Sequence, residues 1–166
     1  MPKLFVERFT EDTIEQFRVA AKMRYDEGWK LALSGHRTAA IYLWGYAAEV
    51  TLKTAWFSLI GFPERKGITR NDLRGAVSIA TSYGIPWPGG AFHNLFAWAQ
   101  LLARHRISLG RRYPGARFEN DMLARSQRIH DRWRETMRYK KNVVYAHETQ
   151  AVADSTNWLL ANRDRL

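Results

Sequence analysis

The stretch YLWGYAAEVTLKTA, residues 42–55, decides the fold that this sequence predicts. Its apolar residues, together with those that flank it, recur at spacings of three and four, which is the period of an α-helix. They form one apolar stripe, made of Ile41, Trp44, Ala48, Leu52, Ala55 and Leu59. Gly45 lies on this stripe, and its missing side chain lets another helix approach closely. We therefore expect a long helix from His36 to about Ile60 at the centre of the molecule.

A neighbouring face of the same expected helix carries polar residues. Glu49 precedes Lys53 by four residues, an order and a spacing that favour an ion pair along a helix. Two interpretations of this pair remain open. In one the pair only fixes helix packing, and in the other Glu49 takes part in a functional site.

The rest of the chain also shows the helical period, and no alternating strand pattern continues for more than a few residues. The first expected helix covers about residues 12–33 and begins with an Asp12–Glu15 capping box. Further helices are expected at 69–83, capped by Thr69, at about 91–109 and at about 118–137. Asn142 is expected to cap a last helix that reaches Ala161. Short loops between long helices favour antiparallel neighbours. The predicted fold class is all-α, an up-and-down bundle of about five or six helices in one domain spanning residues 1–166.

Composition excludes several classes of protein and site. The 166 residues include no cysteine, which excludes disulfides, thiolate nucleophiles and cysteine-ligated metal sites. The longest weakly charged stretch, residues 38–60, still contains Glu49 and Lys53, and the residues after Met1 show no signal-peptide segment. We expect a cytoplasmic protein without a membrane anchor. The five histidines show no metal-ligand spacing with carboxylates, so we expect neither a metal ion nor another cofactor.

Positive charge is concentrated in residues 104–141. This range holds twelve Lys and Arg residues against four Asp and Glu residues, so +8 of the formal net charge of +10 lies there. Arginine outnumbers lysine in the range, which suits bidentate contacts to phosphate. A nucleic-acid partner and a solvated basic face kept for solubility are both compatible with this pattern. The candidate nucleic-acid-binding residues are Arg104, Arg106, Arg111, Arg112, Arg117, Arg125, Arg128, Arg132, Arg134 and Lys140.

Two more segments, HNLFAWAQLL at 93–102 and RWRETMRY at 132–139, complete a characteristic set. Together with residues 42–55 they resemble the HEPN superfamily of helical bundles, particularly its small stand-alone bacterial members. The residues that carry the resemblance are Gly45, Tyr46, Ala47, Glu49, Leu52 and Lys53, then His93, Asn94 and Leu95, then Trp133, Arg138 and Tyr139. The resemblance covers about residues 36–160. The expected helix at about 12–33 and the segment 62–90 are interpreted as elaborations.

This resemblance implies a four- or five-helix bundle, frequent homodimers and, in many members, metal-independent RNA cleavage. Such cleavage uses an arginine and a histidine separated by four to six residues near the start of the last helix, usually with two copies across a dimer. The sequence departs from this motif, because eight residues separate Arg138 from His147. Five residues separate Lys141 from His147, which is the right spacing with the wrong cation. A formal match from Arg125 to His130 lies inside the preceding expected helix and is interpreted as chance.

An active version of this site would give each residue a role. RNA cleavage without a metal ion needs a general base, a general acid and a cation on the phosphate. His147 would be the base or the acid, and Arg138 or Lys141 would hold the phosphate. Asn142 would orient the phosphate, while Glu49 would orient His147 or pair with Arg138. In the alternative, these residues only fix helix packing and no RNA is cleaved.

Three functions remain as hypotheses. The first is an RNA-directed module of toxin or defence type, which binds RNA over residues 104–141, cleaves it at His147 if the degenerate motif is active, and has a separately encoded antitoxin. The second is a non-catalytic homodimeric scaffold, or a nucleotide-binding or substrate-binding subunit, that accompanies a nucleotidyltransferase. The third is a protein that binds a small molecule under the loop IPWPGG, residues 85–90. His93 is interpreted as structural, and Trp87 as the cover of a groove or of another subunit.

Overall fold

The structure, a computed structural model, describes residues 12–88, 92–113 and 115–166. Within these ranges it contains six α-helices, short 3₁₀ helices and no strand, which confirms the predicted all-α bundle. The helices are α1 (Ile14–Leu33), α2 (Arg37–Leu59), α3 (Arg70–Ser82), α4 (Leu95–Ser108), α5 (Ala116–Arg132) and α6 (Ala146–Ala161), with the 3₁₀ helices η3 (Glu135–Tyr139) and η4 (Arg163–Arg165).

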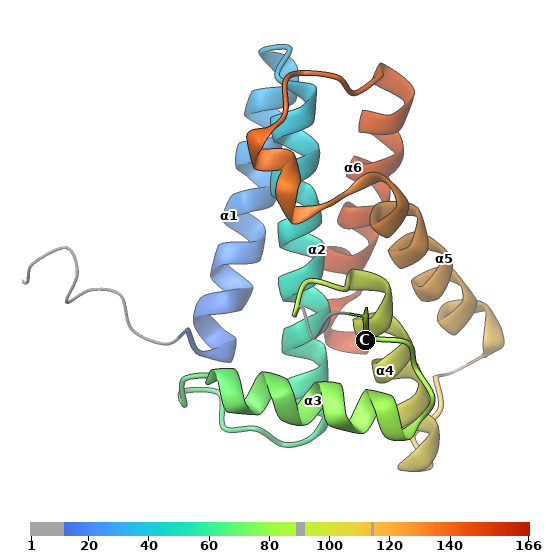
Figure 1. Cartoon of the computed structure of the whole chain (residues 1–166). Helices are drawn as coiled ribbons and strands as arrows, with labels where there is room; N and C mark the ends of the chain where they lie inside the picture. The colour runs from blue at the N-terminus through green and yellow to red at the C-terminus, as the bar shows by residue number, and fades with distance from the viewer. Residues whose placement is uncertain (1–11, 89–91, 114) are drawn as a thin grey trace, which may run out of the picture.

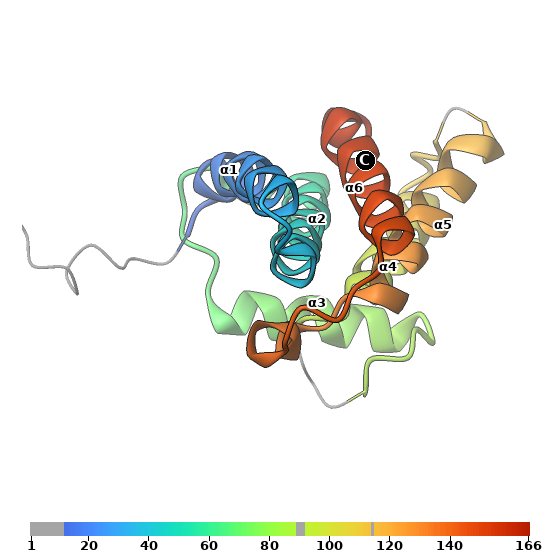
Figure 2. The ribbon, with the colours of Figure 1, turned by 90° about the horizontal axis from the view of Figure 1, so that it is seen from above.

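Helix α2 is the centre of the bundle (Figure 1). It packs against α1, α4, α6 and η3, while α5 packs against α4 and α6. The up-and-down order holds for α1 with α2, for α4 with α5 and for α5 with α6. Helix α3 departs from this order, because it lies across the bundle near the C-terminal ends of α2 and α4 (Figure 2).

The composition of α2 explains why it is central. A helix that is apolar on most of its sides is stable only when neighbours cover those sides. Ile41, Trp44, Leu52 and Trp56 are fully buried, and even the polar Glu49 and Lys53 of this helix are enclosed. The Trp44 indole donates a hydrogen bond to the Tyr25 carbonyl oxygen at 3.0 Å, which fastens α1 to α2. The predicted central helix is therefore confirmed.

Gly45 makes room for a tryptophan. A Cβ atom at this position would overlap the indole of Trp133, the residue that follows α5. The same indole donates a hydrogen bond from Nε1 to the Tyr42 carbonyl oxygen at 3.0 Å. The close approach expected at Gly45 is real, but a side chain makes it and not the backbone of another helix.

Several helix boundaries differ from the prediction at their N-terminal ends. Thr13, and not Asp12, caps α1, because its hydroxyl accepts from the Gln16 amide while the Gln16 side chain accepts from the Thr13 amide. Thr69 caps α3 as predicted. Helix α4 begins at Leu95, later than expected, because Asn94 Oδ1 accepts from the Ala97 amide at 3.0 Å.

The segment between α5 and α6 shows the largest difference. Helix α5 ends at Arg132, before the predicted 137, because Trp133 adopts an extended backbone and turns its indole onto Gly45. The last helix begins at Ala146 and not at Asn142. The Asn142 amide contacts the junction of α1 and α2 instead: its Nδ2 donates to the Gly35 carbonyl oxygen at 2.8 Å, and its Oδ1 accepts from the Thr38 amide at 3.1 Å.

None of the described helices combines the length and the apolar character needed to cross a bilayer.

Trp87 lies against the core of its own chain, with its ring edge-to-face on Trp98 at 5.1 Å between centroids. Four other tryptophans, Trp44, Trp56, Trp98 and Trp133, are buried.

The contact between Gly45 and Trp133 gives a stability prediction. We expect Gly45→Ala to lower the free energy of unfolding by about 1–3 kcal/mol, because the added methyl group overpacks against the indole. Gly75→Ala is the matched control, since Gly75 is exposed on α3 and a Cβ there would meet nothing within 4 Å. Alanine at this control position should stabilise by about 0.5–1 kcal/mol. Urea unfolding followed by circular dichroism measures both changes, and equal effects of the two substitutions would contradict the account.

Candidate functional site

A buried ion pair lies at the centre of the candidate site. The carboxylate of Glu49 is 1% exposed, and its Oε1 lies 2.5 Å from Nζ of Lys53, one helical turn further along α2. The predicted i, i+4 pair is therefore confirmed. Lys53 Nζ also lies over the ring of Trp98, 5.6 Å from its centroid. Burial of two charges is costly unless further hydrogen bonds satisfy them, so the other contacts of Glu49 are important.

His93 supplies those contacts. Its Nδ1 lies 3.1 Å from each carboxylate oxygen of Glu49, and its Nε2 lies 3.4 Å from Oε2 of Glu135. His93 precedes the N-cap residue of α4, and Glu135 begins η3, so three elements meet at this imidazole. His93 has the position of a structural bridge, as the sequence predicted, but it is also about half exposed.

The environment of His93 favours its charged form. The hydrogen bond to Glu49 raises the pKa of the imidazole above its ordinary value near 6.5, burial opposes this, and the negative charge of Glu49 adds to the rise. The charge of Lys53 lowers the pKa and that of Glu135 raises it. The net result is a pKa above the ordinary value, so that more of this histidine is protonated near neutral pH than of an ordinary one.

The three segments that carry the family resemblance converge at this point. Residues 42–55 supply Glu49 and Lys53, residues 93–102 supply His93, and residues 132–139 supply Trp133 and Glu135. Trp133 lies on Gly45 one helical turn from Glu49. Motifs that are far apart in the sequence therefore form one cluster on one face of α2.

A surface hollow of about 240 Å³ opens beside this cluster. We call it the two-histidine hollow, and its lining consists of Pro88, His93, Asn94, His130, Arg134, Glu135 and Thr136. The imidazole of His130 faces the ring of Phe96, 6.4 Å between centroids, and its Nδ1 is buried without a hydrogen-bond partner. Burial, and then the nearby charge of Arg134, lower the pKa of His130, with Asp131 opposing them. The hollow thus holds two histidines whose pKa values are displaced in opposite directions.

The sequence alone did not single out His130, because it stood in an arginine-rich match interpreted as chance. The other half of that match, Arg125, is not in the hollow. Its guanidinium lies over the ring of Trp158, 5.1 Å from the centroid. The spacing of residues could have indicated His130. It lies on α5 four residues, or about one helical turn, before Arg134 and three residues before Trp133.

The residues predicted to be catalytic are not gathered around Glu49. His147 lies exposed in the first turn of α6, with its ring stacked on that of Tyr145 at 5.9 Å. Arg138 lies over the ring of its neighbour Tyr139, and Lys141 is exposed. Asn142 is held at Thr38, which is eleven residues and about 16 Å along α2 from Glu49.

This placement corrects the expected contacts of two residues. Glu49 neither orients His147 nor pairs with Arg138, since its polar partners are Lys53 and His93. Asn142 does not cap the last helix, and its amide is used in the contact with Gly35 and Thr38. A role for His147, Arg138 or Lys141 in RNA cleavage stays a prediction.

Four of the predicted nucleic-acid-binding residues form a stripe on α5. Arg117, Arg125, Arg128 and Arg132 fall within about 80° around the helix axis, and we call them the α5 arginine stripe. One carboxylate of the same face, that of Asp121, approaches Arg117 at 3.9 Å. Of the remaining predicted residues, Arg111, Arg112 and Lys140 are exposed, and Arg134 lines the two-histidine hollow.

Arg106 has a different role from the one predicted. Its Nε donates to the Leu166 carbonyl oxygen at 2.8 Å, and its guanidinium lies over the ring of Tyr113, 4.5 Å from the centroid. These contacts hold α4, the 110–113 segment and the η4 region together. Arg106 is therefore a packing residue and is not freely presented to a ligand.

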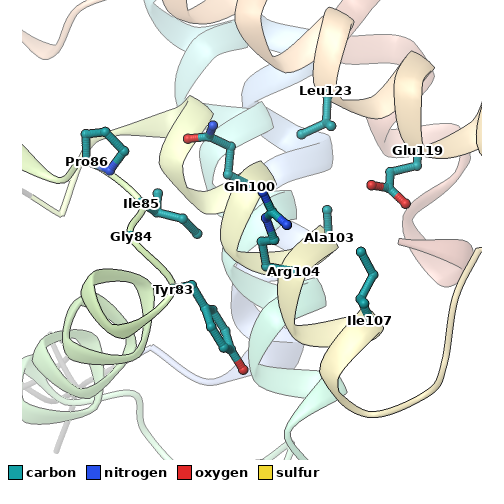
Figure 3. A pocket seen from close by; sticks show the side chains of 10 residues that line it. All are labelled: Tyr83, Gly84, Ile85, Pro86, Gln100, Ala103, Arg104, Ile107, Glu119 and Leu123. Atoms are coloured by element: carbon teal, nitrogen blue, oxygen red, sulfur yellow. The ribbon is translucent and has the colours of Figure 1, made fainter.

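Arg104 belongs to α4 and lines a separate hollow of about 330 Å³ between α4 and α5 (Figure 3). Figure 3 shows this hollow between the 84–86 segment, Gln100 and Arg104 on α4, and Glu119 and Leu123 on α5. It occupies the place of the small-molecule pocket predicted under residues 85–90, of which residues 89 and 90 lie outside the described residues.

In the part of the chain that the structure describes, no group of three or more histidine and carboxylate side chains is arranged to hold a metal ion. Comparisons of the chain with protein-family models, with curated proteins and with solved structures find no match. The contacts described above are therefore the basis for a function.

The raised pKa of His93 makes the stability of the protein depend on pH. A group whose pKa is higher in the folded than in the unfolded state stabilises the fold fully below the unfolded value, and this contribution is lost as the pH rises through the folded value. We expect His93→Gln to have a lower free energy of unfolding than wild type. The difference should be largest below pH 6.5 and should shrink as the pH rises above it. Glutamine keeps a donor for Glu49 but cannot become charged.

Denaturant unfolding of wild type and variant across this pH range measures the difference. His36→Gln, at the exposed N-cap position of α2, controls for the change of side chain. A deficit of His93→Gln that stays constant or grows with pH would contradict the expected protonation of His93.

Proposed function

We propose that this protein is an RNA-binding helical bundle related to the HEPN superfamily. The kinship is supported by the meeting of the three resemblance segments, since Glu49, Lys53, His93 and Trp133 belong to one cluster. A chance likeness of separate segments would not require their side chains to contact one another. The fold class agrees as well, because a central helix with four further long helices around it is a compact α-bundle.

RNA binding rests on the distribution of cations on α5. In the α5 arginine stripe Arg117 and Arg128 are exposed and Arg125 and Arg132 are half-buried, and Asp121 approaches Arg117, so much of the charge of the stripe is uncompensated. Arg125 over Trp158 and Arg165 over Phe118 add aromatic rings under two of the guanidinium groups of this face. Guanidinium groups bind phosphate oxygens bidentately, and their planes stack on bases. This single feature, the α5 arginine stripe, carries the proposal.

The exposed segment 138–147 supports single-stranded RNA as the form bound. Tyr139 and Tyr145 expose 75% and 69% of their surface, which is unusual for large aromatic residues in a folded chain. Lys140 and Lys141 are exposed between them. Exposed rings beside cations form the stacking platforms on which unpaired bases lie. A double helix offers no such bases, so we expect it to bind more weakly.

We assign this segment to binding and not to cleavage at His147. The groups that the sequence placed around His147 have other partners, because Asn142 contacts Gly35 and Thr38 and Glu49 contacts His93. An exposed histidine without such partners stacks on a base as readily as on Tyr145.

The proposal predicts an affinity that depends steeply on salt. We expect the dissociation constant for a mixed-sequence single-stranded RNA to rise strongly between about 50 and 200 mM salt, because each neutralised phosphate releases counterions. The double variant Arg117→Glu and Arg128→Glu should weaken binding and lower the slope of log K against log salt by about 1.4, or about 0.7 for each lost contact. Fluorescence anisotropy measures both quantities.

Arg65→Glu with Arg74→Glu is the matched control for this double variant. Both residues are exposed, Arg65 before α3 and Arg74 on it, and the change in net charge is the same. If the control variant loses as much affinity as the stripe variant, binding reflects net charge alone and the assigned surface is wrong. If wild type binds no RNA at low salt, the proposed function is wrong.

A further inference from the structure

We propose that a further hollow, near the C-terminal ends of α2, α4 and α6, is a binding site for a phosphorylated sugar. We call it the four-arginine pocket, because Arg18, Arg106, Arg111 and Arg163 line it. Its volume of about 330 Å³ falls at the lower end of the range of small-molecule sites, about 300–1,000 Å³. The inference goes beyond the proposed function and does not depend on it, since no residue of the α5 arginine stripe lines this pocket.

The four arginines come from separate parts of the chain. Arg18 belongs to α1, Arg106 to the last turn of α4, Arg111 to the segment after α4, and Arg163 to η4. Among the described residues of the lining, Asp164 alone is acidic. Like charges repel one another, so cations that the fold gathers around one hollow favour an anion as its occupant.

Two of the four arginines are fastened to the protein and form the walls of the pocket. The Arg106 Nε donates to the Leu166 carbonyl oxygen at 2.8 Å. Arg18 donates through Nη1 to the carboxylate of Glu64 at 2.8 Å and through Nη2 to Ser58 Oγ at 3.2 Å. These contacts fix the two guanidinium groups in place beside the pocket.

The other two arginines are available to a ligand. Arg111 is exposed, and its guanidinium makes no ion pair or hydrogen bond with any residue that the structure describes. The Nε of Arg163 lies 3.7 Å from Oδ1 of Asp164, whose side chain is 81% exposed, and so exposed an ion pair contributes little. Guanidinium groups bind phosphate in a fork, and two of them match the charge of a phosphate monoester, about −1.5 to −2 near neutral pH. A single phosphate group is therefore the anion that suits the pocket.

Side-chain oxygens beside the arginines suit the hydroxyl groups of a sugar. Ser58 Oγ accepts from Arg18, and its own proton remains to be donated. The hydroxyl of the buried Thr54 donates to the Thr51 carbonyl oxygen at 2.9 Å, so toward the pocket it is an acceptor. The carboxylate of Asp164 is a second acceptor. The lining thus offers a donor and acceptors in addition to its cations.

The apolar part of the lining is small. Ala55 and Leu59 of α2 supply it together with Leu166, and the carbon-bound hydrogens of a sugar ring can pack against such a surface. None of the described residues that line the pocket is aromatic, so a nucleobase would find no ring on which to stack. We therefore assign the pocket to a sugar phosphate and not to a nucleotide or to the unpaired bases of RNA.

The test is isothermal titration calorimetry of the full chain with ribose 5-phosphate, ribose, inorganic phosphate and adenosine monophosphate as probes. We expect ribose 5-phosphate to bind at one site per chain with a dissociation constant below about 1 mM. It should bind about tenfold more tightly than inorganic phosphate, because the sugar hydroxyls add hydrogen bonds. Ribose should bind more weakly than either, since it lacks the charge. Adenosine monophosphate contains the same ribose 5-phosphate and should bind no more tightly than it.

Variants identify the pocket as the place of binding. Arg111→Gln and Arg163→Gln should each weaken the binding of ribose 5-phosphate about tenfold, because each removes a charged donor to the phosphate. Arg112→Gln is the matched control, since Arg112 is the exposed neighbour of Arg111, carries the same charge and does not line the pocket. Its affinity should stay within about twofold of wild type, because solvent and salt screen a charge outside the pocket. Circular dichroism of each variant shows whether a lost affinity reflects a lost fold.

Four outcomes would overturn the inference. The first is a wild type that binds neither ribose 5-phosphate nor glucose 6-phosphate at about 10 mM. The second is equal affinity for ribose 5-phosphate and inorganic phosphate, which would mean that the sugar is not recognised. The third is a clearly tighter binding of adenosine monophosphate, which would assign the pocket to a nucleotide. The fourth is a loss in Arg112→Gln as large as that in Arg111→Gln, which would mean that binding reflects net charge.

The same titration separates this inference from RNA binding. The double variant Arg117→Glu and Arg128→Glu should bind ribose 5-phosphate as wild type does, and a loss there would place the ligand on the α5 arginine stripe and overturn the inference. A wild type that binds ribose 5-phosphate and no RNA supports the inference and overturns only the proposed function.

Discussion

The site depends on the contacts that the buried carboxylate of Glu49 makes with Lys53 and His93. A carboxylate that is 1% exposed is tolerated only when cations and hydrogen-bond donors surround it, and here Lys53 and His93 supply both. The three residues come from α2 and from the segment just before α4, and His93 extends the contacts to Glu135 of η3. Removal of one partner of such a cluster leaves an uncompensated buried charge, which typically costs about 3–5 kcal/mol. The cluster therefore holds the elements in register as well as presenting an imidazole to the surface.

The contact of Trp133 with Gly45 acts on the same face of α2 and explains the path of the chain. The indole needs the open side of Gly45 and the Tyr42 carbonyl oxygen, so the backbone leaves the helical conformation after Arg132. This exit places Arg134 and Glu135 beside His93 and leaves residues 138–147 as an exposed connection to α6. One packing contact thus shapes both the hollow and the aromatic segment that we assign to RNA.

Local rules predicted much of this arrangement, and long-range contacts account for what they missed. The central helix, its ion pair and the Thr69 cap follow from spacing within a few residues. Asn142 has the residue type of a helix cap, yet its amide is used by Gly35 and Thr38. No spacing rule joins His93 to Glu49, which are 44 residues apart, or identifies the Trp133 indole as the occupant of the open side of Gly45. The motifs that carried the resemblance named residues that the structure brings together, such as Glu49, Lys53 and His93, but they did not give the mutual contacts of these residues.

The most direct measurement of the central claim is a titration of the His93 side chain by NMR in wild type and in Glu49→Gln. The account predicts that His93 titrates above its ordinary value near 6.5 in wild type, and that its pKa falls when Glu49 loses its charge. A His93 that titrates at or below the ordinary value, or that is unaffected by Glu49→Gln, would contradict the claim that the buried carboxylate orients and charges this imidazole.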